Sequence, residues 1–247
     1  MINYLRADLK RIYMRIPRLI ALLVVYAALI AMLCFSVDEE WNGINFVVTL
    51  SQFSIALPVL LGVIELVSVY ADDFKAKTMQ IAIGIGIKRR RVILVKLIEM
   101  AVLICTDLLF LALVALIVGG GILHAGLQAE QYVDTAVLIL DVWMKIVGYS
   151  SISMILMFFM QSTGMATLVY IALSSTVVYR LSSMLLEAKW IAPLHLGRYT
   201  ITALLNIFHS QLVLGNFHIA SLIGILIYVG LGFGITVFLF KGRELEF

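Results

Sequence analysis

YADDFKAKTMQIAIGIGIKRRRVILVK, residues Tyr70 to Lys96, is the only long polar interruption in a chain of 247 residues that is 63% hydrophobic. It holds two adjacent acids, a short segment with helical spacing, two glycines and four consecutive cations from Lys88 to Arg91. A segment this charged cannot stay in hydrocarbon, so it must lie in water beside a membrane. Its excess of lysine and arginine places it on the cytoplasmic side. A folded, amphipathic loop between two spans predicts a docking surface for a soluble partner.

The composition of the whole chain predicts an all-α membrane protein. The mean hydropathy is +1.08, and only 13% of the residues are charged. A soluble protein can bury one apolar stretch of about 20 residues, but not five or six of them. No polar block is long enough for a second soluble domain. We therefore expect residues 1–247 to form a single membrane domain, with no nucleotide site of its own and no nucleic-acid partner.

Residues 1–18 form an amphipathic segment. Its apolar residues recur at spacings of 3, 4, 3 and 4, which puts them on one helical face: Ile2, Leu5, Leu9, Ile12 and Ile16. Most of its charged residues lie off that face. A helix of this kind lies in the headgroup region of an anionic leaflet. The alternative is a basic flank that only sets the orientation of the first span.

The apolar runs predict six spans with both termini in the cytoplasm, at about 19–35, 46–69, 92–118, 135–160, 165–179 and 219–240. Pro58 is expected to kink the second span, and Gly119 to Gly121 to end the third. Gly230 and Gly234 form a G-x-x-x-G pattern in the last span, which can permit close helix packing. With this topology, 14 of the 18 lysines and arginines are cytoplasmic, and the positive-inside rule then sets the orientation.

Residues 180–217 mix charged and apolar side chains between the last two predicted spans. Tyr199 to Leu214 is apolar enough to suggest a seventh span, but that topology would place Lys241 and Arg243 outside. We expect instead outer-side helices that dip partly into the membrane.

Known catalytic patterns are not found in the sequence. A P-loop needs G-x-x-x-x-G-K-[ST] to cradle phosphate, and nothing matches it. The histidine and carboxylate spacing typical of zinc hydrolases is also absent. An intramembrane serine protease needs a serine and a histidine that meet. The only hint of one, Gly148 to Ser151, lies far along the chain from His195, His209 and His218. We therefore expect no catalytic residue and no metal.

The charged residues inside the predicted spans are candidates for a polar path or for pairing between helices: Glu65, Glu99, Asp107, Asp141 and Lys145. A carboxylate in hydrocarbon costs about 2.5–3.5 kcal/mol on insertion scales, so it normally faces protein or water. Glu65, Lys96 and Glu99 can alternatively anchor helix ends at the inner interface. Asp141 precedes Lys145 by four residues, the favourable order for an intrahelical ion pair. Asp107 is the deepest acid and has no obvious partner.

The charged loop also resembles the first cytoplasmic loop of type-2 ATP-binding-cassette (ABC) exporter permeases, among them bacitracin-resistance and bacteriocin-immunity permeases. That loop reads acid, Gly-Thr-Leu, a helical turn, Gly-Ile-Ser-Arg, and an apolar run ending in lysine. The matching positions are Asp72 or Asp73, Thr78-Met79, Gly86-Ile87, Arg89 and Lys96. Lys77 stands where the family has glycine, and Lys88 where it has a small polar residue.

The resemblance implies the permease subunit of an ABC exporter in a bacterial cytoplasmic membrane, with an N-terminal elbow helix. Two permease chains, identical or different, would pair, and each would hold a separate ATPase that binds ATP and magnesium. Residues 70–91 would be the coupling loop. Its expected docking contacts are Asp72, Asp73, Phe74, Lys75, Thr78, Met79, Ile81 and Arg89. The cargo would be hydrophobic or amphipathic, such as a peptide antibiotic, bacteriocin or toxin.

A second reading of the sequence needs no ATPase. The chain would be a stand-alone secondary transporter or channel, with Asp107 and Glu99 as proton or cation sites. Secondary transporters often contain inverted repeats and broken helices. No repeat is recognisable in the sequence.

Overall fold

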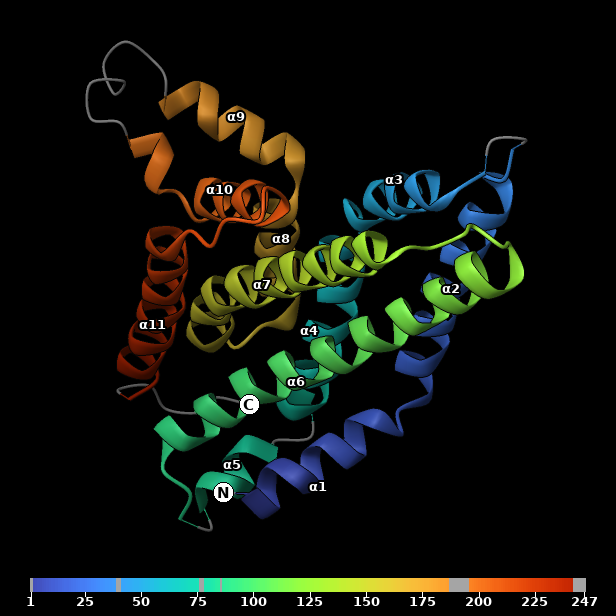
Figure 1. Ribbon diagram of the computed structural model, residues 1–247. Coiled ribbons are helices and arrows are strands. Elements are labelled where there is room, and N and C mark those ends of the chain that lie inside the picture. The colour runs from blue at the N-terminus through green and yellow to red at the C-terminus, as the bar shows by residue number, and fades with distance from the viewer. Residues whose placement is uncertain (1, 39–40, 76–77, 85, 187–195, 242–247) are drawn as a thin grey trace.

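The computed structural model describes residues 2–38, 41–75, 78–84, 86–186 and 196–241, and within these ranges the chain is helical and has no strand (Figure 1). The α-helices, in chain order, are α1 (Ile2–Tyr13), α2 (Ile16–Phe35), α3 (Gly43–Ser54), α4 (Leu57–Lys75), α5 (Thr78–Gly84), α6 (Arg89–Leu116), α7 (Ala129–Met160), α8 (Thr163–Ser174), α9 (Thr176–Leu186), α10 (Ile201–Val213) and α11 (Ile219–Lys241). A π-helical turn, η1 (Ile117–Ile122), continues α6, and a 3-10 turn, η3 (Leu196–Tyr199), precedes α10.

Four of the described helices are long and apolar enough to cross a membrane: α2, α6 with η1, α7 and α11. Two bent pairs, α3 with α4 and α8 with α9, pass the same test when each pair counts as one span. The chain is therefore an all-helical protein with four to six candidate membrane spans, and these agree in position with the six predicted runs. The prediction of an all-α, multi-pass chain is confirmed to that extent.

The second predicted span is broken rather than kinked. Pro58 is the second residue of α4, a position where its missing N–H costs nothing. Its ring would clash with the carbonyl of Ser54 in a continuous helix, and α3 ends at Ser54. The chain therefore bends by 49° between α3 and α4.

The fifth predicted span is also broken, between α8 and α9, with a bend of 68°. The two breaks are neighbours, because the hydroxyl of the buried Tyr170 in α8 donates a 2.5 Å hydrogen bond to the carbonyl of Pro58 at the start of α4. This bond ties α8 to the start of α4 beside the first break.

Helix α7 is the centre of the bundle. In its most apolar window 61% of the residues are buried, against 28% for α2 and 17% for α11. It packs against α3, α4, α6, α8, α10 and α11. The peripheral helices keep large apolar side chains exposed, including Leu23 of α2 and Phe238 of α11. Such helices are stable where lipid or another chain covers them.

Helices α1 and α5, the start of α6 and the end of α11 lie together at one end of the bundle, while α3, α9 and α10 lie at the other (Figure 1). Helix α1 lies along α6: Asp8 pairs with Lys96, and the Tyr13 hydroxyl is 2.6 Å from Thr106 Oγ1. The N-terminal helix and the charged loop are therefore on the same side, as the sequence predicts.

Residues 180–217 contain α10, which is too short for a seventh span. Its 13 residues extend about 20 Å at 1.5 Å per residue, whereas a hydrocarbon core is about 30 Å thick. This favours the prediction of an outer-side helix. The part of that segment from 187 to 195 lies outside the described residues.

Close packing in the last helix depends on Gly232, which the G-x-x-x-G pattern did not single out. A Cβ atom at Gly232 would lie 2.6 Å from the backbone oxygen of Ser151 in α7. A Cβ at Gly230 or Gly234 would have no described heavy atom within 4 Å. The contact of α11 with α7 therefore requires glycine between the two positions of the pattern.

We expect Gly232→Ala to destabilise the protein by about 1–3 kcal/mol, because the added methyl group must push backbone atoms of α7 and α11 apart. Gly234→Ala is the matched control: it makes the same change in the same helix and should keep or slightly raise stability. The free energy of unfolding in mixed detergent micelles measures both. Equal values for the two variants would contradict the assigned packing role.

Candidate functional site

The charged loop contains the short helix α5, which is seated on the bundle by one face. Met79 and Ala82 are three residues apart and are 1% and 4% exposed, whereas Ile81 on the opposite side is 62% exposed. The helix contacts both α4 and α6. An exposed isoleucine on this short helix leaves an apolar side chain available to another protein. Met79 is buried, so its position favours seating α5 rather than meeting a partner.

The end of α5 is fixed by Gly86, one of the residues that carry the family resemblance. Gly86 has φ of +93°. Its N–H donates to Ile83 O at 2.9 Å, and the Ile87 N–H donates to Ala82 O at 3.1 Å. This pair of bonds is the Schellman arrangement, in which a left-handed residue, usually glycine, closes a helix. A side chain at Gly86 would strain the turn between α5 and α6.

Arg89, a predicted docking contact, joins two helix ends. Its Nη1 donates to the carbonyl oxygens of Phe240 at 2.7 Å and Lys241 at 3.3 Å, and its guanidinium lies 5.3 Å from the Phe240 ring centroid. A cation at a helix C-terminus stabilises the carbonyls that have no partner within the helix. Arg89 therefore ties the start of α6 to the end of α11.

The remaining predicted docking residues cannot be placed by their side chains. Asp72, Asp73, Phe74 and Lys75 form the last turn of α4, and Thr78 begins α5. The structure describes the backbone of these five residues but not their side chains.

Directly behind the loop, Lys96 and Glu99 of α6 form a buried cluster with Asp8 of α1. Lys96 Nζ forms an ion pair with Asp8 and a second ion pair with Glu99, whose Oε2 is 2.9 Å away. The second pair is an electrostatic contact without a well-aligned hydrogen bond. Arg11 adds a second cation, 2.5 Å from Asp8 Oδ1. Two acids and two cations balance, so this cluster fastens α1 to α6. Its composition supports the anchoring role for Lys96 and Glu99.

A second buried cluster joins three helices through Arg18. Its Nε is 2.8 and 3.0 Å from the two carboxylate oxygens of Glu65 in α4, and its Nη2 is 2.7 Å from both oxygens of Asp107 in α6. The three residues are 3%, 0% and 5% exposed, respectively. We call Arg18, Glu65 and Asp107 the charge triad.

The charge triad holds two acids and one cation. No other described cation forms an ion pair with either acid. If all three groups are ionised, one negative charge remains uncompensated in a buried position, where an unpaired charge is costly. A proton or a small cation would remove that excess. The charge triad can therefore bind a proton or a small cation.

The sequence identified both acids of the triad but not their partner. The sequence showed no obvious partner for Asp107, and the structure pairs it with Arg18. Glu65 was considered with Lys96 and Glu99 as an anchor, yet the structure groups it with Asp107. Arg18 was assigned to the interfacial segment, because it lies beside four other cations; in the structure it is the third residue of α2. Arg18 lies 47 residues from Glu65 and 89 residues from Asp107 along the chain. Pairs this far apart produce no local pattern that sequence analysis could detect.

The last predicted pair is present. Lys145 Nζ is 2.7 Å from Asp141 Oδ2 within α7, as the spacing predicts. His209 of α10 adds a third group, with Nδ1 3.5 Å from the same oxygen. This cluster lies at the end of the bundle where α3 and α10 lie, away from the charged loop.

We expect Arg18→Gln to destabilise the protein by about 3–5 kcal/mol, because it leaves two buried carboxylates without a cation. Asp107→Asn removes the surplus acid and leaves a one-to-one pair of Arg18 with Glu65, so its effect should stay within about 1 kcal/mol. Arg6→Gln, an exposed substitution in α1, is the control. Unfolding in detergent measures all three, and a large loss for Asp107→Asn would show that the triad is not over-supplied with acid.

Comparison with models of known protein families gives no match to this chain, and comparison with curated proteins gives no significant match.

Proposed function

We propose that this chain is the membrane subunit of an ABC exporter, driven by a separate ATPase that docks on α5. The observation that carries the proposal is the seating of α5: one face is buried on the bundle by Met79 and Ala82, and the other presents Ile81. A helix held in this way can receive a push from a soluble partner and pass it to the spans.

The connections of α5 support a role in transmitting force. It is joined to α4 at one end and, through the closed turn at Gly86, to α6 at the other. The start of α6 is in turn fixed to α11 by Arg89 and to α1 by Lys96. A displacement of α5 would therefore move α4, α6, α11 and α1 together rather than deform the loop alone.

The rest of the proposal follows from the resemblance of the loop to that of type-2 exporter permeases. Two such chains would pair, and ATP with magnesium would bind to the partner ATPases, not to this chain. The apolar faces left exposed on α2 and α11 offer surface for lipid and for a second chain. The cargo would be a hydrophobic or amphipathic molecule, with peptide antibiotics, bacteriocins and toxins as the class implied by the family.

We expect Ile81→Glu to prevent association with the ATPase, because a charge would have to be desolvated at the centre of the contact. The tagged chain is purified from its native membrane, bound proteins are identified by mass spectrometry, and ATP hydrolysis by the preparation is measured. Wild-type protein should carry an ATPase, and the variant should retain about a tenth of it or less.

Ala7→Glu is the matched control, since it places the same charge on an exposed position of α1 at the same end of the bundle. It should leave ATPase association unchanged. A wild-type preparation without nucleotide hydrolysis, or an Ile81→Glu variant that keeps its ATPase, would contradict the proposal.

The charge triad favours a second candidate function. Glu65 and Asp107 share one guanidinium inside the helical bundle, and a site with one surplus negative charge can take up and release a proton or cation. On this reading the chain would be a stand-alone ion-coupled transporter.

The two candidates differ in a vesicle experiment with purified chain alone. The ABC proposal expects no transport and no proton flux without an ATPase. The ion-coupled candidate expects a proton flux, measured with an internal pH dye, that Asp107→Asn abolishes although the variant inserts and folds normally. A flux that persists in this variant would exclude the triad as its site.

A further inference from the structure

A polar cavity of about 490 Å³ lies at the end of the bundle opposite the charged loop. Both helix breaks border it: Ser54 and Ile55 at the first, Ser175 and Thr176 at the second. Hydroxyl and amide groups of α7, α9 and α10 complete its wall, namely Tyr149, Tyr179, Thr202 and Asn206. Polar backbone and side chains at membrane depth are tolerated where they border a cavity.

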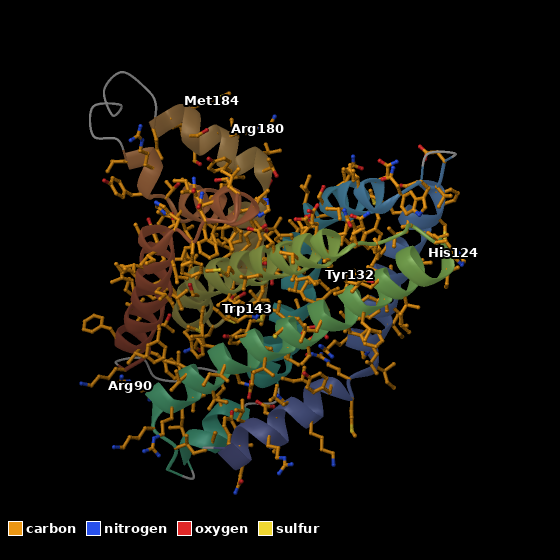
Figure 2. The ribbon with its side chains drawn as sticks, in the orientation of Figure 1. Arg90, His124, Tyr132, Trp143, Arg180 and Met184 are labelled. Carbon is orange, nitrogen blue, oxygen red and sulfur yellow. The ribbon has the colours of Figure 1, made fainter. Side chains whose placement is uncertain are left out.

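The cations of this end of the chain gather at the cavity. Lys145 and Arg180 line it, and an adjoining cavity of about 410 Å³, which shares Tyr179 and Asn206, is lined by Arg198. Figure 2 shows Arg180 on α9, at the opposite end from Arg90. Only four of the 18 lysines and arginines fall outside the N-terminal segment, the charged loop and the C-terminal end. Three of them border these two cavities.

The charges of the described residues around the cavities are not balanced. Asp141 neutralises Lys145, whereas Arg180 and Arg198 form no ion pair among the described residues. Lysine and arginine are normally rare on the outer side of a membrane protein. Two guanidinium groups that have no counter-ion among the described residues lie beside a polar cavity and therefore indicate an anionic ligand. Guanidinium is the group best suited to phosphate.

The start of α9 adds a second donor set. This helix of 11 residues begins at Thr176, on the wall of the cavity. Its first backbone bond back into the chain is that of the Tyr179 N–H to Ser175 O. The N–H groups of Thr176, Val177 and Val178 have no hydrogen-bond partner among the described residues. Helix N-termini favour anions.

Asp141 supplies an acceptor that has no partner. Its side chain is 4% exposed and lines the cavity, and Oδ1 forms no hydrogen bond with the described residues. A buried carboxylate oxygen without a donor is costly. A ligand that fills this cavity should therefore carry a hydroxyl or amino donor beside its anionic group.

We infer that the cavity binds the headgroup of an anionic amphiphile, in which a phosphate carries a neighbouring hydroxyl or amine. The phosphate meets Arg180 and the start of α9, and the hydroxyl or amine donates to Asp141 Oδ1. The site needs no ATPase and does not rest on the proposed function.

Binding is measured by native mass spectrometry of the purified full chain in detergent, with lipids of identical acyl chains. We expect phosphatidylglycerol to bind about tenfold more tightly than phosphatidylcholine. Phosphatidylmethanol keeps the charge of phosphatidylglycerol but lacks the hydroxyl, and it should bind several-fold more weakly than phosphatidylglycerol. Equal binding of all three lipids would overturn the inference.

Arg180→Gln should weaken phosphatidylglycerol binding about tenfold, and Asn206→Phe, which fills the junction of the two cavities, should also weaken it. Both residues are exposed, so folding should be unaffected, which thermal unfolding checks. Arg6→Gln at the other end of the bundle is the matched control. Variants that bind phosphatidylglycerol as the wild type does would overturn the assignment.

Two soluble probes distinguish a water-soluble phosphate ligand from a lipid headgroup. Glycerol 3-phosphate or inorganic phosphate that binds in the absence of lipid, and is lost in Arg180→Gln, supports the same site with a water-soluble ligand. Binding of phosphatidylglycerol that neither probe displaces supports a membrane amphiphile. Probe binding that is unchanged in Arg180→Gln counts against the cavity.

Discussion

The buried guanidinium of Arg18, held between Glu65 and Asp107, is the interaction on which the arrangement of the first helices depends. A cation at this depth is stable only where carboxylates surround it. It therefore fixes α2 against the middle of both α4 and α6. The Tyr13 ring, 5.1 Å from the guanidinium carbon, adds a contact from α1. Four helices converge on a single side chain.

Electrostatic ties continue from this point towards the charged loop. Lys96 of α6 pairs with Asp8 of α1, closer to the charged loop than the charge triad is. Arg89 joins the start of α6 to the end of α11. Helix α5 is attached to this braced assembly through α4 and α6. These contacts connect a short surface helix to several of the candidate spans.

The opposite end of the bundle is built on another principle. There both broken spans border polar cavities instead of closing into continuous helices. Breaks leave backbone groups that need water, side chains or ligand. The Tyr170 hydroxyl bonds to the Pro58 carbonyl beside the first break, and hydroxyl side chains line the cavity at both breaks. One end is therefore braced by ion pairs, while the other combines broken helices, cavities and two arginines that form no ion pair with the residues the structure describes.

Apolar run lengths and the positions of lysine and arginine in the sequence were sufficient to predict an all-helical chain, the approximate span positions, the position of the charged loop and the Asp141–Lys145 pair. All of these depend on residues near one another along the chain. Only the tertiary structure decided that Arg18 meets Glu65 and Asp107, that Gly232 rather than Gly230 or Gly234 is the packing glycine, and that both helix breaks share a cavity. Each of these contacts joins helices far apart in sequence. Hydrophobicity and local periodicity carry no information about which helix faces which.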